Sequence, residues 1–294
     1  MKVVPFWGCM MPLKYPQMEL AIRKTFPNLG IELVEIDGFT CCPDPIYFKA
    51  RDKIKWLTIA ARNLAVAEET GLDIVTMCSG CISTLKEAQY ILDEDPHLRD
   101  EINQRLKRIN KEYKGNIKVK HAVVMIRDDI GIDVVKKSIK RPLDGIKVGI
   151  HYGCHLLKPS QIMHVDDADY PNVLDDLVST TGATPLNHDE KLLCCGKGCM
   201  DDELPLEMTE AIFKSIEASG ADCMGLICPT CFSSFDIGQI MLSRKKGRTY
   251  NIPVIYIFQL LGLAQGLGSE EVGLHMHRVK ADRVLEKIKG CVEV

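Results

Sequence analysis

The chain has 294 residues, 46% of them hydrophobic and 26% charged, which is typical of a globular protein with enough sequence for one large domain or two ordinary ones. A formal net charge of −3 argues against a nucleic-acid surface as the main partner, because phosphate binding needs clustered positive charge. No secretory signal is recognisable, and the longest uncharged run, residues 251–269, falls short of the roughly 20 apolar residues that span a bilayer. We therefore expect a cytoplasmic protein without membrane insertion, in which this run is a buried segment or a subunit contact, the buried segment being favoured.

Hydrophobic periodicity predicts alternating strands and helices in both halves of the chain. In the first half the predicted elements are a strand at 2–6, a helix at 16–26, a strand at 31–36, a long helix at 46–69, a strand at 73–77, and a helix after Cys81 that runs to about Tyr113 with a break at Pro96. In the second half they are a strand at 146–151, a helix at 173–181, a weak strand at 183–187, a helix at 204–219, a strand at 221–227 and a helix after Cys231. Alternation of this kind implies a mainly parallel sheet in each half, so the predicted fold class is α/β with two Rossmann-like βαβ domains.

Thirteen cysteines are the unusual feature of this composition. An odd number in a reducing compartment argues against a disulfide framework and leaves metal binding, redox chemistry or simple burial. Ten of them form two copies of one pattern, a single cysteine, then an adjacent pair, then a CxxC motif. The first copy is Cys9, Cys41, Cys42, Cys78 and Cys81, and the second is Cys154, Cys194, Cys195, Cys228 and Cys231.

The residues around the cysteines repeat as well. The segment VVPFWGC, which ends at Cys9, matches VGIHYGC, which ends at Cys154, and CISTL from Cys81 matches CFSSF from Cys231. The two copies start 145 residues apart, so each has the length of a domain. We infer a duplication, with a first domain at 1–144 and a second at 145–294.

The cysteine groups share one predicted location. All but one lie just beyond the C-terminal end of a predicted strand, where doubly wound sheets place their sites. The exception is the pair Cys194 and Cys195, which a loop separates from the weak strand. The helices after the CxxC motifs direct their N-termini at the same region, which favours thiolate over thiol.

Five thiolates in each half are one more than a tetrahedral zinc ion or an ordinary cubane cluster takes. An adjacent pair suits two irons better than one ion, so the pattern favours an iron–sulfur cluster of unusual shape, unless the fifth cysteine is a spare or a redox thiol. A thioredoxin-like role for either CxxC motif is the lesser alternative, because that motif normally works alone. Cys223 and Cys291 are predicted to be plain buried residues, whereas Cys199 could be a spare ligand, a redox thiol or neither.

These residues resemble the cysteine-rich CCG domain, named for an adjacent cysteine pair followed by glycine. Cys194-Cys195-Gly196 fits that name, whereas the first copy departs from it with Cys41-Cys42-Pro43. Two such domains without a fused ferredoxin segment are similar to the catalytic CCG-domain component of the soluble heterodisulfide reductase of methanogenic archaea, and the resemblance runs from Cys9 to Cys231.

That resemblance implies a function. Each domain would hold one non-cubane 4Fe-4S cluster on its five cysteines, and both clusters would face the coenzyme M–coenzyme B disulfide, which is reduced to two thiols. Electrons would come from a separate iron–sulfur subunit, fed by a flavin-containing subunit that is coupled to a hydrogenase or formate dehydrogenase. Because the coenzymes carry sulfonate, phosphate and carboxylate groups, we expect cations near the cysteines, and the candidates are Lys14, His155, Lys158 and Lys197.

Two other functions stay open at this stage. CCG domains also resemble parts of glycolate, lactate and glycerol-3-phosphate oxidising complexes and of thiol-linked fumarate reductases, where they could relay electrons to a quinone without handling a disulfide. A zinc-binding scaffold is the third possibility, and the fifth cysteine of each set argues against it.

Overall fold

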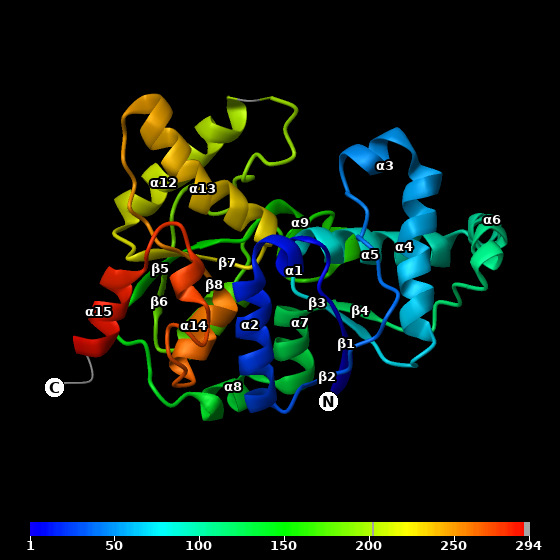
Figure 1. Cartoon of the computed structure of the whole chain (residues 1–294), viewed down its shortest axis with the longest axis horizontal. Helices are drawn as coiled ribbons and strands as arrows, with labels where there is room; N and C mark the ends of the chain where they lie inside the picture. Colours follow the sequence, from blue (N-terminus) through cyan, green and yellow to red (C-terminus); the bar gives the residue numbers. More distant parts are fainter. Residues whose placement is uncertain (202, 291–294) are drawn as a thin grey trace.

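The computed structural model describes residues 1–201 and 203–290 and confirms the α/β fold class (Figure 1). The first half contains β1 (Lys2–Phe6), α1 (Met10–Lys14), α2 (Pro16–Thr25), η1 (Phe26–Leu29), β2 (Glu32–Leu33), α3 (Tyr47–Arg51), α4 (Lys53–Glu68), β3 (Ile74–Thr76), α5 (Ser79–Glu94), α6 (Pro96–Leu106), η2 (Lys107–Ile109), β4 (Val119–His121), α7 (Ala122–Met125), η3 (Ile126–Ile130) and α8 (Ile132–Ser138). The second half contains β5 (Lys147–His151), α9 (Cys154–Leu157), α10 (Ser160–Met163), α11 (Val173–Thr180), β6 (Thr184–Leu186), α12 (Leu204–Ser219), β7 (Cys223–Leu226), α13 (Pro229–Lys246), β8 (Val254–Tyr256), α14 (Ile257–Ala264), η4 (Leu274–Met276) and α15 (Asp282–Gly290). Cys291 lies outside the described residues.

The two halves have the same sheet topology. The strand orders are β2-β1-β3-β4 and β6-β5-β7-β8, and every neighbouring pair is parallel. In this order the chain reverses direction across the sheet between β1 and β3, and again between β5 and β7. Loops that leave the C-terminal ends of such a strand pair run to opposite faces of the sheet and leave a crevice between them, which is where doubly wound proteins bind ligands. The duplication therefore extends from sequence to topology.

The predicted elements differ from the observed ones mainly at their ends. The helix predicted over 46–69 is two helices, because the backbone of Asp52 is extended (φ −153°) and its side chain caps α4 by accepting from the Lys55 amide. The predicted break at Pro96 is present, and the helix expected after Cys81 starts earlier, at Ser79, with Cys78 as its N-cap. Two short strands, β4 and β8, did not emerge from the sequence pattern, because three residues carry too little periodicity.

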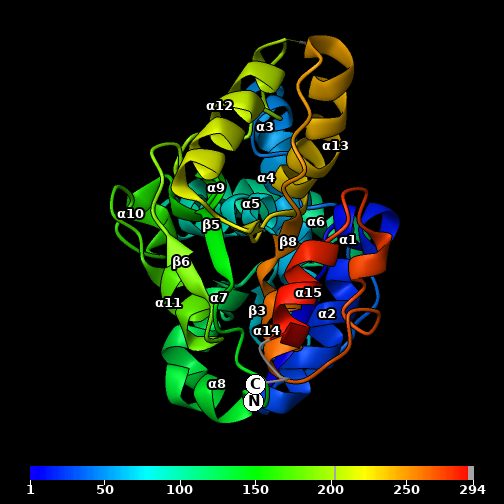
Figure 2. The same cartoon turned by 90° about the vertical axis from the view of Figure 1, so that its left-hand side faces the viewer.

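The hydrophobic run at 251–269 forms β8 and the fully buried helix α14. Helix α14 packs against α2 of the first half, and both views show the two helices side by side (Figures 1 and 2). The ring of Phe258 meets that of Phe26 edge-on, with centroids 5.3 Å apart. The expectation of a buried segment is correct, and its role is to join the halves.

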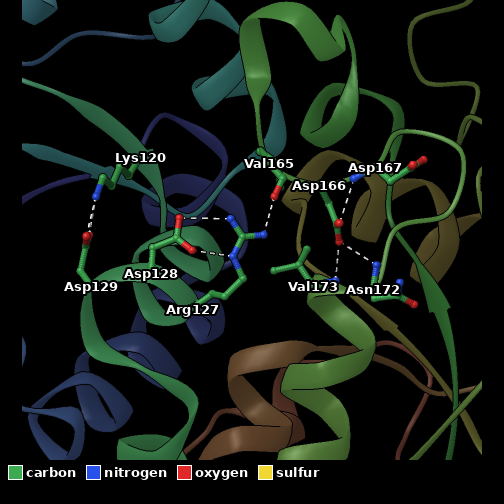
Figure 3. Close-up of polar contacts among 9 residues, drawn as sticks. All are labelled: Lys120, Arg127, Asp128, Asp129, Val165, Asp166, Asp167, Asn172 and Val173. Carbon is green, nitrogen blue, oxygen red and sulfur yellow. Dashed lines mark hydrogen bonds and ion pairs between the residues drawn. The ribbon is translucent and has the colours of Figure 1, made fainter.

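A polar contact ties the halves at a second place (Figure 3). The Arg127 guanidinium, on η3 of the first half, donates to the Val165 carbonyl at 2.6 Å and pairs with the neighbouring Asp128. Asp166, the residue after Val165, accepts from the backbone amides at 172 and 173 and so fixes the start of α11. We keep 1–144 and 145–294 as a proposed division into two domains, each with one sheet. None of the described helices is long and apolar enough to cross a bilayer.

We predict that the Phe258→Ala substitution lowers the free energy of unfolding by about 3–5 kcal/mol, because it leaves a cavity between α14 and α2. The matched surface change Met276→Ala, at a side chain that is 43% exposed, should cost less than about 0.5 kcal/mol. Urea unfolding curves of the two variants measure the difference. A cost below about 1 kcal/mol for Phe258→Ala would contradict a shared core.

Candidate iron–sulfur site

The strand ends place the cysteines at the two crevices. Cys9 follows β1 and is the N-cap of α1, and Cys78 follows β3 and is the N-cap of α5. In the second half Cys154 begins α9 after β5, and Cys228 is the N-cap of α13 after β7. Each CxxC motif therefore opens a helix of 16 or 18 residues, whose N-terminal amides and dipole favour negative charge at the sulfurs.

The thiols of each half lie in contact as a chain of neighbours. In the first set the Sγ atoms of Cys9 and Cys41 are 3.9 Å apart and those of Cys42 and Cys81 are 3.3 Å apart. In the second set the Sγ atoms of Cys154 and Cys194 are 3.8 Å apart. The Cys195 and Cys231 thiols also shift each other's pKa, as do the two members of each adjacent pair and of each CxxC motif.

The two sets meet at their centre. Cys78 and Cys228 shift each other's pKa, so the first cysteine of each CxxC motif lies near its counterpart from the other half. Tyr256, at the end of β8 in the second half, also reaches the first half and donates its hydroxyl to the carbonyl of Met77. The ten repeated cysteines thus lie in one row that runs from the first half of the chain to the second.

Only some members of this row are stabilised as thiolates. Hydrogen bonds from Cys41 and Cys81 hold the pKa of Cys42 well below its usual range, and bonds from Cys231 and Cys78 do the same for the pKa of Cys228. The pKa of Cys194 is lowered by bonds from Cys154 and Cys195. The pKa of Cys81 is raised, because its thiol is shared with Cys42 and Cys78 and because it is buried. A buried row of this kind needs bound cations before every sulfur can be a thiolate.

These features fit an iron–sulfur group in each set. The donors are soft sulfurs, most of them are buried, and they are gathered at helix N-termini. Among residues 1–201 and 203–290, no three His, Cys, Asp or Glu side chains are arranged to bind a single metal ion. The assignment of the ten cysteines as ligands is a proposal that rests on this donor chemistry.

Glycines allow the sulfurs to approach the backbone. Gly8 (φ +68°) and Gly153 (φ +75°) occupy the same position before Cys9 and Cys154. A Cβ atom on Gly8 would lie 2.7 Å from the Cys81 sulfur, and one on Gly153 would lie 3.3 Å from the Cys231 sulfur. Both the positive φ and the lack of space require glycine here.

A cleft with a cavity volume of about 100 Å³ adjoins the row. Its walls include all five cysteines of the second set and none of the first. The five are Cys154, Cys194, Cys195, Cys228 and Cys231. The first half contributes residues 44–47, Ser79 and Gly80, and the Tyr47 hydroxyl donates to the Gly198 carbonyl at 2.6 Å across the cleft. The cleft therefore lies between the two halves and opens onto the second cysteine set.

The structure brings three of the four candidate cations to clefts. His155 and Lys197 line the cleft just described, and Lys14 and Lys197 line a second cleft together with Cys199 and Ser233. Lys158 lines neither of the two. No carboxylate among the described residues is paired with Lys14 or Lys197, so both are available to an anion.

Two of these cations make equivalent contacts. The Nζ of Lys14 donates to the Ser233 hydroxyl at 3.4 Å, and Nδ1 of His155 lies 3.3 Å from the Ser83 hydroxyl. Ser83 and Ser233 occupy the same position in the repeats CISTL and CFSSF, and each contact crosses between the halves. Cys223 is buried inside β7, as predicted, and burial raises its pKa to about 12.

Sequence reasoning missed three buried polar residues beside the cysteines, namely His121, His151 and Tyr256. Each is the last residue of a parallel strand, at the same sheet edge as the cysteines. The end of the predicted strand at 146–151 was a usable signal for His151. No such signal existed for His121 and Tyr256, because their strands β4 and β8 were not predicted.

Residues 3–86 and 148–236 both match the cysteine-rich CCG domain family. The chain belongs to this family. The two matches cover the two cysteine sets and confirm the inferred duplication of the motif.

Full-length relatives are known. One component of the ferredoxin/F420H2-dependent CoB-CoM heterodisulfide reductase of Methanosarcina acetivorans is 38% identical, covering 98% of this chain and 97% of its own. The 8-methylmenaquinol:fumarate reductase membrane anchor subunit of Wolinella succinogenes is 30% identical, covering 95% of this chain and 97% of its own. A crystal structure of a hypothetical protein from Helicobacter pylori has the same fold, with a TM-score of 0.73 and 18% identity, over 95% of this chain and 52% of that one.

We predict that Gly8→Ala lowers the iron content of anaerobically purified protein, because the added methyl group would lie 2.7 Å from the Cys81 sulfur and displace it. Gly30→Ala is the matched control, since Gly30 has nearly the same φ (+71°) with nothing within 4 Å. It should cost about 1–2 kcal/mol of stability from backbone strain but keep the full iron content. Equal iron in the two variants would show that Gly8 does not serve the cysteine site.

Proposed function

We propose that this protein reduces the coenzyme M–coenzyme B heterodisulfide to two thiols, using two non-cubane 4Fe-4S clusters. The observation that carries the proposal is the single row of ten cysteines that meets at Cys78 and Cys228 beside a cleft. The similarity to a heterodisulfide reductase component over nearly the whole chain supports the same reaction.

The proposed ligands follow the duplication. Cys9, Cys41, Cys42, Cys78 and Cys81 would hold the first cluster, and Cys154, Cys194, Cys195, Cys228 and Cys231 the second. Bound there, the clusters would supply the two electrons that splitting a sulfur–sulfur bond requires. The balance is one disulfide, two electrons and two protons giving two thiols. Two sites that approach each other at Cys78 and Cys228 match this demand, because a cluster usually transfers one electron at a time.

The chain itself would bind and orient the substrate. The cleft lies between the halves, so a disulfide inside it would be shielded from bulk water by residues 44–47 and the loop at 197–198. Lys197, on the rim of both clefts, and Lys14, in the second, would pair with the sulfonate, phosphate or carboxylate groups of the coenzymes. His155 would face the reacting part of the cleft.

The proposed partners are an iron–sulfur subunit, a flavin-containing subunit, and a hydrogenase or formate dehydrogenase in the larger complex. The supporting observation is that the similar proteins are named as subunits of reductases. A reducing location such as the cytoplasm agrees with the twelve described cysteines, which are all free.

A second candidate function is electron relay to a quinone-linked partner without disulfide turnover. The 30% identity to a membrane anchor subunit of a menaquinol-linked fumarate reductase favours it. In that case the cleft would be a partner or quinone contact rather than a disulfide site.

The deciding experiment is iron and acid-labile sulfide analysis of anaerobically purified protein, followed by electron paramagnetic resonance with and without the coenzyme M–coenzyme B disulfide. We expect about eight irons per chain and a new paramagnetic signal when the disulfide is added. Eight irons without a response would support the relay function. Zinc in place of iron would overturn the redox proposal.

We predict that Lys197→Ala raises the KM for the heterodisulfide by about tenfold, because one charge-assisted contact is lost, while kcat changes little. Lys158→Ala, which removes a lysine that lines neither cleft, should leave both constants unchanged. Steady-state kinetics with a reduced viologen donor measures both variants. The same KM change in the two would mean that net charge, not a local contact, binds the substrate.

A further inference from the structure

The two halves place different side chains at matching points beside the cysteines. The last residue of β1 is Phe6, and the last residue of its counterpart β5 is His151. The last residue of β4 is His121, and that of its counterpart β8 is Tyr256. The duplication is therefore exact in topology but not in the chemistry at these strand ends.

His121 carries a buried N–H group without an acceptor. Its side chain is 1% exposed, and Nδ1 accepts from the Val123 amide at 3.4 Å. A ring whose Nδ1 accepts is neutral and carries its proton on Nε2. Nε2 has no partner among the described residues, and the Cys228 sulfur is close enough to influence the ring electrostatically. Burial holds the pKa of His121 at about 3, with Cys228 opposing the shift, so the ring is neutral.

His151 presents a second unpaired N–H. The residue is fully buried, its ring meets that of Phe235 edge-on at 4.7 Å, and neither ring nitrogen has a partner among the described residues. One of the two nitrogens carries a proton in either tautomer. Both Cys194 and Cys228, which belong to the second set, act on this ring electrostatically.

The first set has no equivalent pair of imidazoles among the described residues. Phe6 offers no donor at the position of His151, and the hydroxyl of Tyr256 is already bonded to the Met77 carbonyl. Among the described residues of the first half, the buried hydroxyls of Tyr15, Thr76 and Ser79 and the indole N–H of Trp56 are unpartnered. Ser79 lines the cleft of the second set, and Thr76, two residues before Cys78, is the hydroxyl to be tested at the first set.

Buried N–H groups are almost always hydrogen-bonded, so an unpaired one marks a place where a ligand accepts. We propose that His121 and His151 donate hydrogen bonds to sulfur atoms of the iron–sulfur group at the second cysteine set, and that the second site therefore has the higher reduction potential. The inference rests on the proposed function only in requiring a cluster at each set. Donors to sulfur stabilise the reduced, more negative state and so raise the potential.

The proposed difference in reduction potential places the higher value at the site that borders the cleft. All five cysteines of the second set line the cleft and none of the first set does. A higher potential at the second site would collect electrons next to the bound disulfide. A tenfold preference of one electron for that site corresponds to about 59 mV.

Single-site proteins test the potentials directly. The Cys41→Ser/Cys42→Ser double variant leaves the second site, and Cys194→Ser/Cys195→Ser leaves the first. Redox titration followed by electron paramagnetic resonance then gives one potential for each. We expect the second site to titrate at the more positive value. Equal potentials, or the reverse order, would overturn the proposal.

Histidine variants test the cause. In the protein that retains the second site, His121→Leu and His151→Phe should each shift the midpoint potential to a more negative value, whereas His121→Gln, which keeps an N–H donor, should restore part of the shift. In the protein that retains the first site, Phe6→His should raise the potential, and Thr76→Val should leave it nearly unchanged.

The matched control is His188→Gln. His188 is also buried in the second half, but Nδ1 is 3.0 Å from the Ser215 hydroxyl and Nε2 is 3.0 Å from the Ile150 carbonyl, so neither nitrogen is free. Its substitution should not move the potential. The proposal would be overturned if the His121 and His151 substitutions left the midpoint potential unchanged. It would also be overturned if His188→Gln shifted that potential by the same amount.

Iron analysis of each variant separates this inference from the proposed function, because the titration needs clusters but no disulfide substrate. Protein with iron at both sites and unequal potentials would support the inference even if no disulfide were reduced. Protein without iron would overturn both proposals.

Discussion

The packing of ten cysteine sulfurs into one mostly buried row is the constraint on which the rest of this structure depends. Neighbouring thiolates repel each other, and burial removes the water that would otherwise stabilise them. In the protein alone, only Cys42, Cys194 and Cys228 among the described cysteines have a lowered pKa, each because adjacent thiols donate to it. Bound iron would supply the missing positive charge, so cluster assembly and stability of the site should be closely linked.

The doubly wound topology explains how so many cysteines reach one place. Parallel strands bring all their C-terminal ends to the same edge, and the reversal of strand order opens a crevice there. The CxxC motifs add helix N-termini that face the sulfurs, and Gly8 and Gly153 remove the side chains that would obstruct them. Each half supplies this arrangement once, and the approach of Cys78 to Cys228 combines the two.

The halves also exchange functional groups, so neither site is complete within one half. Tyr256 reaches from the second half to the carbonyl before Cys78, and His121 of the first half lies near Cys228. The basic residues Lys14 and His155 contact the equivalent serine of the opposite half. Helix α14 is buried against α2 and packs the two halves together, so these contacts between halves can form. A duplicated sequence has in this way become one asymmetric arrangement, in which only the second cysteine set lines the cleft between the halves.

The sequence by itself determined the cysteine sets, the parallel α/β class and the position of the cysteines at strand ends, because spacing, periodicity and repeats are local properties of the chain. The tertiary structure alone decided that the two sets lie near each other, that Lys197 borders both clefts whereas Lys158 borders neither, and that His121 and His151 lie beside the second set. These facts depend on how α14 and α2 pack and on the short strands β4 and β8, whose three residues each carry almost no pattern of their own. Contacts between residues more than 100 positions apart are set by the packing of whole layers, which no local spacing encodes.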